Sequence, residues 1–338
     1  MERQFAELFA SARQTMQFCA VKPNENVVVF RDTGTRQALA DAFHSAALAT
    51  GAEVTIVSIT TRPGSLHNPT EPAIKALMEA DVAFDLASHA WLYTDATNRI
   101  LNAGTRMLQV LVGVDTVIAR PPTAEIAARE RISRELLEKA DKFRITSDLG
   151  TDITLRRGDR PVHTQGGFVD RPGDWDSYGV FLAAFAPPET EADGVLVVDG
   201  TLFLPSDIKQ TTEAPIRTRV EHGRLVDVDT STAQGRLMSE WLAAWKDPNS
   251  YVIAHTGFGL DERAKFEAPD SESYLAGVNV AFGANNIPQL KGQTVCKSHL
   301  DIVLRNVNVE LDGKTVIEGG QFVDGLGFPS VREAALVG

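Results

Sequence analysis

The 338-residue chain has only two cysteines, Cys19 and Cys296, and neither belongs to a paired zinc-binding motif. Two cysteines cannot form a disulfide framework in a chain of this length, so the sequence indicates reduced thiols and a cytoplasmic location. The chain also lacks any apolar run near the roughly 20 residues of a membrane helix. Its first residues lack the apolar segment of a signal peptide. We therefore expect a cytoplasmic protein with no membrane partner.

Positive charge is also scarce, because the chain has 33 lysines and arginines but 45 acidic residues, which gives a formal net charge of −12. A protein with this charge is repelled at long range by nucleic acid and by anionic membrane surfaces. The hydrophobic share of 43% and the charged share of 23% are those of an ordinary globular protein. The composition thus argues against nucleic acid as a partner and favours a small molecule.

The length exceeds what one hydrophobic core usually holds, so we expect two domains. In the first, residues 1–142, an amphipathic N-terminal helix is followed by short β-branched runs that alternate with helical stretches. The expected strands are 27–30, 54–59, 81–86 and 107–112, and the expected helices are 35–50, 71–80 and 95–103. This alternation predicts an open α/β domain with a parallel sheet and helices on both faces.

A long polar helix, expected at 123–142, leads into the second domain, residues 143–338. Short strands are expected at 143–146, 152–155, 195–198, 216–220 and 225–228, a last hairpin turns at Asp312-Gly313, and helices are inserted at 233–246 and 271–276. Short strands separated by turn signals are typical of antiparallel pairing. The fold class is therefore α/β, with a mixed, mainly antiparallel β domain in the second half.

The candidate chemistry lies in residues 296–305, Cys-Lys-Ser-His-Leu-Asp-Ile-Val-Leu-Arg. Apolar side chains there alternate with His299 and Asp301, which is the period-two pattern of a half-buried strand. Because side chains two apart on a strand share a face, His299 and Asp301 must point the same way. They form either a pair of metal ligands or a hydrogen-bonded surface pair.

His255 is the best candidate for a third ligand, because it follows an apolar strand at 251–254 and precedes a glycine-rich turn. Two histidines and one carboxylate form the facial set that suits non-haem Fe(II) and leaves positions open for O2 and substrate. A structural histidine satisfied by hydrogen bonds is the alternative.

Two loops are also candidates for function. Residues 164–178 combine glycines, acids and aromatics, and Trp175 and Tyr178 could sandwich a flat ring. The alternative is a surface loop packed on its own aromatic residues. Residues 60–72 form a long proline-rich loop, which we expect to cover a cleft or a partner subunit.

Three segments together resemble a known family. They are 255–260 (His-Thr-Gly-Phe-Gly-Leu), 296–306 and 170–176 (Asp-Arg-Pro-Gly-Asp-Trp-Asp). They resemble 2,5-dihydroxypyridine 5,6-dioxygenases, which are Fe(II) ring-cleaving enzymes on the scaffold of the aminopeptidase T (M29) metallopeptidases. The resemblance runs through most of the chain. It implies that His255, His299 and Asp301 are the Fe(II) ligands.

The same resemblance implies substrate contacts at Tyr93, Gln165 and Ser177, and at Tyr93 and Ser177 it implies that a histidine has been replaced. Tyrosine and serine exchange protons only weakly near neutral pH, so we expect these groups to orient the substrate. Arg305 is the fourth expected contact. His163 is a candidate for the missing base.

The predicted function is that of a mononuclear Fe(II) dioxygenase that opens a hydroxylated pyridine or a related aromatic ring with O2. One alternative is a metal-dependent hydrolase of the M29 scaffold that uses Zn2+ or Mn2+ to activate water. Another is a binding protein whose triad is structural. The family implies identical subunits, and the loop at 60–72 and the apolar N-terminal helix lead us to expect a homo-oligomer.

Overall fold

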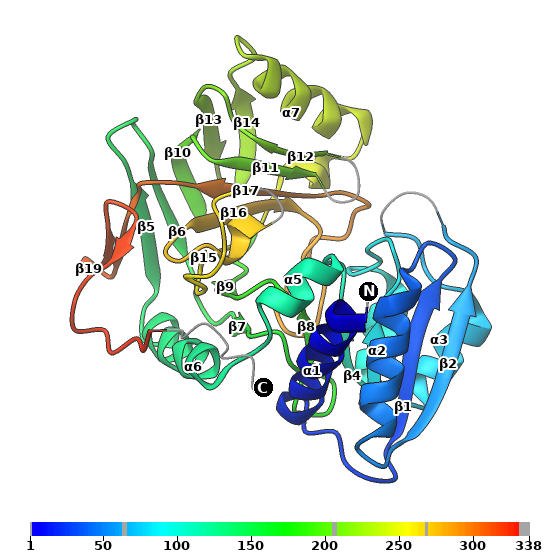
Figure 1. Cartoon of the computed structure of the whole chain (residues 1–338). Coiled ribbons are helices and arrows are strands. Elements are labelled where there is room, and N and C mark those ends of the chain that lie inside the picture. The colour runs from blue at the N-terminus through cyan, green and yellow to red at the C-terminus, as the bar shows by residue number, and fades with distance from the viewer. Residues whose placement is uncertain (1, 63–65, 205–207, 268–269, 331–338) are drawn as a thin grey trace. The chain divides into compact units, whose positions relative to one another are not determined.

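The chain forms two compact units. The computed structural model describes residues 2–62, 66–204, 208–267 and 270–330, and Figure 1 labels its helices and strands. Unit 1 contains the described residues up to 127 together with 165–180, and unit 2 contains 128–164 and 181–330. The fold class agrees with the sequence prediction, a parallel α/β sheet followed by antiparallel sheets.

The division of the chain differs from the single boundary predicted at residue 142. The main chain leaves unit 1 at 127 and returns to it at 165–180. The returning segment carries β8 (Trp175–Ser177), which pairs in parallel with β4 (Arg106–Gln109). Because β8 has only three residues and no apolar periodicity, its place in the first sheet depends on pairing with a strand distant in sequence.

Unit 1 is built on a five-stranded parallel sheet of order β2-β1-β3-β4-β8. Its other strands are β1 (Asn26–Asp32), β2 (Glu53–Ile59) and β3 (Val82–Asp85). The helices are α1 (Glu2–Phe18), α2 (Gln37–Leu48), α3 (Glu71–Met78), α4 (Asp95–Asn102) and α5 (Val114–Ala119). All four predicted strands of this region are present, and α5 is a short helix that the sequence prediction missed.

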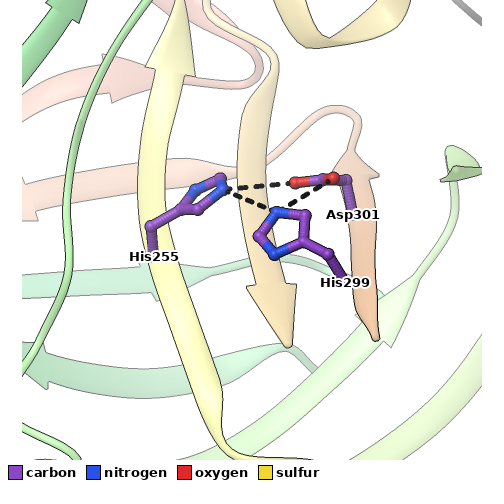
Figure 2. Close-up of side chains that lie close together, drawn as sticks. All are labelled: His255, His299 and Asp301. Atoms are coloured by element: carbon purple, nitrogen blue, oxygen red, sulfur yellow. Dashed lines mark hydrogen bonds and ion pairs between the residues drawn. The ribbon is translucent and has the colours of Figure 1, made fainter. Parts of the chain in front are cut away.

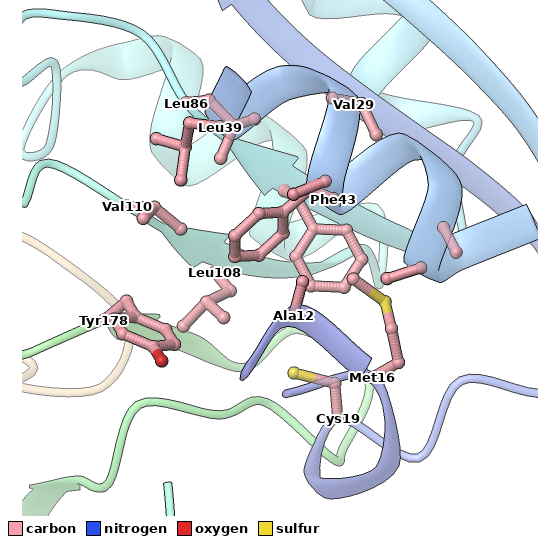
Figure 3. Packing of buried hydrophobic residues seen from close by; sticks show 14 of the residues in the cluster. Ala12, Met16, Cys19, Val29, Leu39, Phe43, Leu86, Leu108, Val110 and Tyr178 are labelled. Atoms are coloured by element: carbon pink, nitrogen blue, oxygen red, sulfur yellow. The ribbon is translucent and has the colours of Figure 1, made fainter. Parts of the chain in front are cut away.

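The core of unit 1 lies between the sheet and the helices α1, α2 and α5. Figure 3 shows Phe43 of α2 among Ala12 and Met16 of α1 and Leu108 of β4, all of them buried. Leu8, Ala12 and Met16 of α1 are thus buried inside unit 1, whereas Phe5 near the start of the helix is exposed. Most of the apolar face of α1 is therefore used within unit 1, and self-association stays a prediction.

Unit 2 holds two sheets whose defined strand pairs are antiparallel. The eight-stranded sheet has the order β14-β13-β10-β6-β5-β18-β19-β20, with β5 (Lys142–Thr146), β6 (Asp152–Arg156), β10 (Ala192–Val198), β13 (Ile216–Glu221), β14 (Arg224–Val228), β18 (Asn308–Leu311), β19 (Lys314–Glu318) and β20 (Gln321–Phe322). The seven-stranded sheet has the order β12-β11-β17-β16-β15-β9-β7, with β7 (Val162–Gln165), β9 (Leu182–Phe185), β11 (Thr201–Leu204), β12 (Ile208–Thr211), β15 (Ile253–Gly259), β16 (Val278–Gly283) and β17 (His299–Leu304). The predicted hairpin at Asp312-Gly313 joins β18 to β19.

Within the part of the chain that the structure describes, helices and helical turns accompany these sheets. They are α6 (Ala124–Glu138), α7 (Ala233–Ala244), the 3-10 turn η1 (Pro248–Tyr251) and a second 3-10 turn, η2 (Asp270–Ser273). The predicted helix at 123–142 ends early, because Lys142 already belongs to β5. No described helix has both the length and the apolar character needed to cross a membrane.

The predicted helix at 271–276 is wrong. The segment forms a short 3-10 turn, η2 (Asp270–Ser273). Ala276 has a left-handed backbone with φ of 60°, which no α-helix accommodates. Serine and aspartate side chains also compete with the helical hydrogen bonds, which favours a turn here.

Polar side chains occupy one row at the carboxyl end of the parallel sheet. Asp85 pairs in register with Gln109, and Gln109 pairs with Ser177. Gln109 Nε2 donates to Asp85 Oδ2 over 3.0 Å, and the Ala87 amide donates to Asp85 Oδ1 over 3.1 Å. Burial of the carboxyl group raises the pKa of Asp85 to about 7, although both hydrogen bonds oppose the shift.

This raised pKa predicts a pH dependence of stability. Between the ordinary value of 3.8 and about 7 the folded state holds a proton that the unfolded state has released, so the free energy of unfolding falls as pH rises through this window. Asp85→Asn removes the titrating group, and Gln109 can turn its amide oxygen toward the new NH2. We expect the variant to lose this slope and to exceed the parent in stability at pH 8, measured by urea unfolding. A parental slope in Asp85→Asn would contradict the assignment.

Candidate metal centre

Three neighbouring strands of the seven-stranded sheet build the candidate centre. His255 lies on β15, Asp301 and His299 lie on β17, and β16 runs between them. Ala281 of β16 pairs with His255 on one side and with Asp301 on the other, and Gly283 pairs with His299. Because residues opposite one another share a face, the three side chains rise on the same side of the sheet.

The register that places His255 in this row depends on an irregularity in β15. Ile253 pairs with Phe282 and His255 pairs with Ala281, so β15 advances by two residues where β16 advances by one. Such a β-bulge inserts one residue and turns the following side chain toward a new face, and bulges are common beside active sites. The extra residue is Ala254.

The small side chains of β16 leave room for the cluster. Its sequence, Val-Asn-Val-Ala-Phe-Gly, alternates large apolar residues with small or polar ones. Val278, Val280 and Phe282 are fully buried on one face, whereas Ala281 and Gly283 lie on the face of the histidines. A larger residue at 281 would fill the space that the three polar side chains share.

Figure 2 shows the three side chains converging on one another. His255 Nε2 lies 3.3 Å from His299 Nε2 and 3.4 Å from Asp301 Oδ1, and His299 Nε2 lies 3.3 Å from Asp301 Oδ2. The exposed fractions are only 7%, 7% and 3% for His255, His299 and Asp301. The predicted triad is thus a real cluster, and the alternative of a surface hydrogen-bonded pair is wrong because the group is buried.

The protonation of the cluster suits metal binding. His299 Nδ1 lies 2.8 Å from the Ala284 carbonyl, which can accept a hydrogen bond only if Nδ1 carries the proton, so the ring is held with Nε2 directed into the cluster. Burial lowers the pKa of His255 to about 4 even though the charge of Asp301 acts to raise it, so this imidazole is neutral near pH 7. Burial acts to raise the pKa of Asp301, but the neighbouring imidazoles and the Asn279 amide outweigh it and lower that pKa.

This donor set fits one divalent cation. Bonds from imidazole nitrogen and carboxylate oxygen to such ions are about 2.0–2.2 Å long. The two Nε2 atoms are 3.3 Å apart and each lies 3.3–3.4 Å from one oxygen of Asp301, so both rings and the carboxylate can reach one ion at that length. Among the described residues, His255, His299 and Asp301 are the one group of three or more histidine, cysteine or acidic side chains close enough to hold a metal. Two histidines with one carboxylate form the facial set of non-haem iron sites.

Of the predicted substrate contacts, Gln165 and Ser177 are held by one buried carboxylate in unit 1. Asp176 Oδ1 accepts hydrogen bonds from Gln165 Nε2 over 3.3 Å and from the Ser177 amide over 2.6 Å. Asp176 Oδ2 accepts from the successive amides of residues 166, 167 and 168 over 2.9–3.1 Å. Asp176 therefore fixes the glycine-rich loop and both candidate residues.

Tyr93 has a strained backbone just before α4. Its φ is 65°, in the left-handed region that side-chain-bearing residues rarely adopt. Its neighbours hold this conformation in place, because Thr94 caps α4 and Thr97 Oγ1 donates to the Trp91 carbonyl over 3.1 Å. A contact between Tyr93 and substrate stays a prediction.

Arg305 follows β17 and is exposed, with its guanidinium 4.7 Å from the centre of the Phe266 ring. This contact gives it a packing role in unit 2, and its contact with substrate stays a prediction. His163 lies buried in β7.

The suggestion that Trp175 and Tyr178 sandwich a ring is not supported. Tyr178 is fully buried in the core of unit 1, and its hydroxyl donates to the Val117 carbonyl over 2.9 Å. Trp175 is also buried and belongs to β8. The alternative, a surface loop packed on its own aromatic residues, does not describe them either, because Tyr178 packs against Phe43 of α2 and Trp175 pairs with β4.

Sequence reasoning missed Ala281, Asn279 and Asp176, each of which touches or neighbours a candidate residue. The alternation of large and small residues in β16 was a usable signal for Ala281 and Asn279. For Asp176 the signal was the Gly166-Gly167 pair earlier in the same segment, which pointed to a tight loop that needs an acceptor for its amides.

The fold and the cluster define a class of two-domain α/β proteins that carry a buried pair of histidines and one carboxylate on an antiparallel sheet. A family model described as 2,5-dihydroxypyridine 5,6-dioxygenase matches residues 7–324. The chain therefore belongs to this family. The resemblance noted in the sequence is confirmed.

Individual relatives agree with this membership. The 2,5-dihydroxypyridine 5,6-dioxygenase of Pseudomonas putida KT2440 is 28% identical over 263 residues, which are 74% of this chain and 73% of the relative. A solved structure of the 2,5-dihydroxypyridine dioxygenase from the same strain has a TM-score of 0.86 at 24% identity and covers 95% of this chain and 98% of that one. Wild-type AmpT from Thermus thermophilus has a TM-score of 0.63 at 12% identity, over 94% of this chain and 99% of AmpT. The expected aminopeptidase T scaffold is thereby confirmed as the fold.

The geometry of β16 predicts the effect of a larger side chain at position 281. Ala281→Leu should place its branch between His255 and Asp301, and we expect Co(II) affinity to fall at least about tenfold in a titration of the full chain. Val280→Ala on the opposite face is the control, which should lose roughly 2 kcal/mol of stability while keeping Co(II) affinity. Parental Co(II) affinity in Ala281→Leu would contradict this description of the centre.

Proposed function

We propose that the protein is a mononuclear, Fe(II)-dependent dioxygenase that cleaves a hydroxylated pyridine or a related N-heterocyclic or aromatic ring. The observation that carries the proposal is the buried cluster of two imidazole nitrogens and one carboxylate, mutually 3.3–3.4 Å apart. Family membership and a P. putida relative named as a 2,5-dihydroxypyridine 5,6-dioxygenase support the reaction class.

His255, His299 and Asp301 would hold the iron. The chemistry that Fe(II) supplies when bound is open coordination positions at which an electron-rich ring and O2 can meet. The low pKa of His255 keeps its lone pair available near neutral pH, and the Ala284 carbonyl keeps the Nδ1 proton of His299 away from the donor atom. Burial of the cluster limits the access of bulk water.

In this proposal Tyr93, Gln165, Ser177 and Arg305 contact and orient the ring. The strained backbone of Tyr93 and the anchoring of Gln165 and Ser177 on Asp176 support defined, preorganised positions for three of them. Tyrosine and serine hydroxyls can donate or accept hydrogen bonds to ring hydroxyls without changing charge near neutral pH. Their task is therefore to hold the substrate.

A dinuclear hydrolase is the weaker alternative. Two acids follow the first histidine, but Asp261 lies 2.8 Å from Arg263 Nε and Glu262 lies 3.0 Å from Arg129. Both acids are thus neutralised by arginines. Among the described residues the metal-binding group comprises three side chains, which suits one ion.

Oxygen uptake by the Fe(II)-loaded, anaerobically purified protein tests the proposal. We expect consumption of O2 with a dihydroxypyridine from a panel of such rings, and no hydrolysis of peptides. Asp301→Ala should keep its fold but lose iron and activity, since the anionic ligand is gone, and His255→Ala and His299→Ala should behave alike. His222→Ala, at an exposed hairpin turn, is the matched control and should match the parent. An Asp301→Ala protein with parental iron content and turnover would refute the site.

We also propose that the protein forms a homo-oligomer. The prediction depends on the family and on the loop at 60–72, of which residues 63–65 lie outside the described residues. Sedimentation at micromolar concentration should give a mass above that of the 36.7 kDa chain. A single 36.7 kDa species would contradict it.

A further inference from the structure

Asn279 lies on the cluster face of β16, two residues before Ala281. Its Nδ2 is 3.2 Å from Glu272 Oε1 and 3.5 Å from Asp301 Oδ1. Because both carboxylates can only accept when ionised, the amide must present its two N–H groups to them. The Asn279 side chain therefore bridges a ligand of the centre and a second acid.

The buried amide of Asn279 does not favour the stability of the fold. Asn279 is fully buried, and its Oδ1 has no hydrogen-bond partner among the described residues. A buried polar atom without a hydrogen-bond partner destabilises a fold relative to a satisfied or apolar atom at the same place. An apolar residue would serve packing better, so the two N–H groups are what this position provides.

Glu272 is held in place from both sides. It lies in η2, where Ser271 Oγ is 2.7 Å from Thr201 Oγ1 and the Phe181 amide donates to Ser273 Oγ over 3.0 Å. Both serines are buried, and Glu272 itself is 8% exposed. Its backbone is therefore fixed, and its carboxylate offers the amide a defined acceptor.

We propose that Glu272 and Asn279 are positioning residues that fix the orientation of the Asp301 carboxylate toward the metal. Glu272 holds one N–H of the Asn279 amide, and the other N–H holds Asp301 Oδ1. This arrangement selects one rotation of the carboxylate and disperses its charge in a site that excludes water. The inference rests on the proposed function, in which the cluster binds one divalent cation.

Titration of the full chain with Co(II), followed by its visible absorption, tests this arrangement without relying on turnover. Asn279→Ala should weaken Co(II) binding by about tenfold and alter the Co(II) spectrum, since the carboxylate is free to rotate. Glu272→Gln keeps the shape and an acceptor oxygen, so its loss should be smaller. Glu272→Ala should add no further loss in the Asn279→Ala background, because Glu272 acts on Asp301 through the amide.

Thr218→Ala provides the control, because Thr218 is equally buried and donates to the Leu196 carbonyl in the other sheet. It should lose stability and keep both Co(II) affinity and spectrum. Should Asn279→Ala fail to fold, Glu272→Gln and Glu272→Ala carry the test. Parental Co(II) affinity and spectrum in the Asn279 and Glu272 variants, or additive losses in the double variant, would overturn the positioning role alone. A parent chain that binds no Co(II) would overturn the metal site itself.

Discussion

The burial of Asp301 is the constraint on which the candidate centre depends. An ionised carboxylate in a water-poor interior is strongly unfavourable unless a partner balances its charge. Its nearest neighbours are two imidazoles, and burial lowers the pKa of His255 to about 4, so that ring supplies no positive charge near neutral pH. The donor atoms therefore converge on one point with a carboxylate among them, and a divalent cation balances the charge of that carboxylate.

The seven-stranded sheet accommodates the buried cluster because the central strand, β16, carries small side chains on the cluster face. On β16 the large residues Val278, Val280 and Phe282 fill the core on one face, and the other face carries an asparagine, an alanine and a glycine. The bulge at Ala254 then turns His255 into the row of Asp301. The two outer strands, β15 and β17, thus supply the three ligands, and the central strand contributes small side chains and no ligand.

Unit 1 contributes preorganisation of a different kind. The two carboxylate oxygens of Asp176 accept hydrogen bonds from the Gln165 side chain, from the Ser177 amide and from three loop amides. The backbone of Tyr93 has a left-handed conformation. These features give defined positions to residues whose proposed task is to orient a ring. The serine and tyrosine favour recognition through hydroxyl groups over proton transfer by a histidine.

The sequence by itself determined the α/β class, most strands of both units, and the three cluster residues, because period-two alternation is a local property that places His299 and Asp301 on one face. Tertiary structure alone decided the rest. Strand order, the bulge that aligns His255, the return of residues 165–180 to unit 1, and the bridge from Glu272 through Asn279 to Asp301 all depend on pairing between residues far apart in the chain. Local periodicity carries no information about such register, since a strand's pattern is the same whichever neighbour it pairs with.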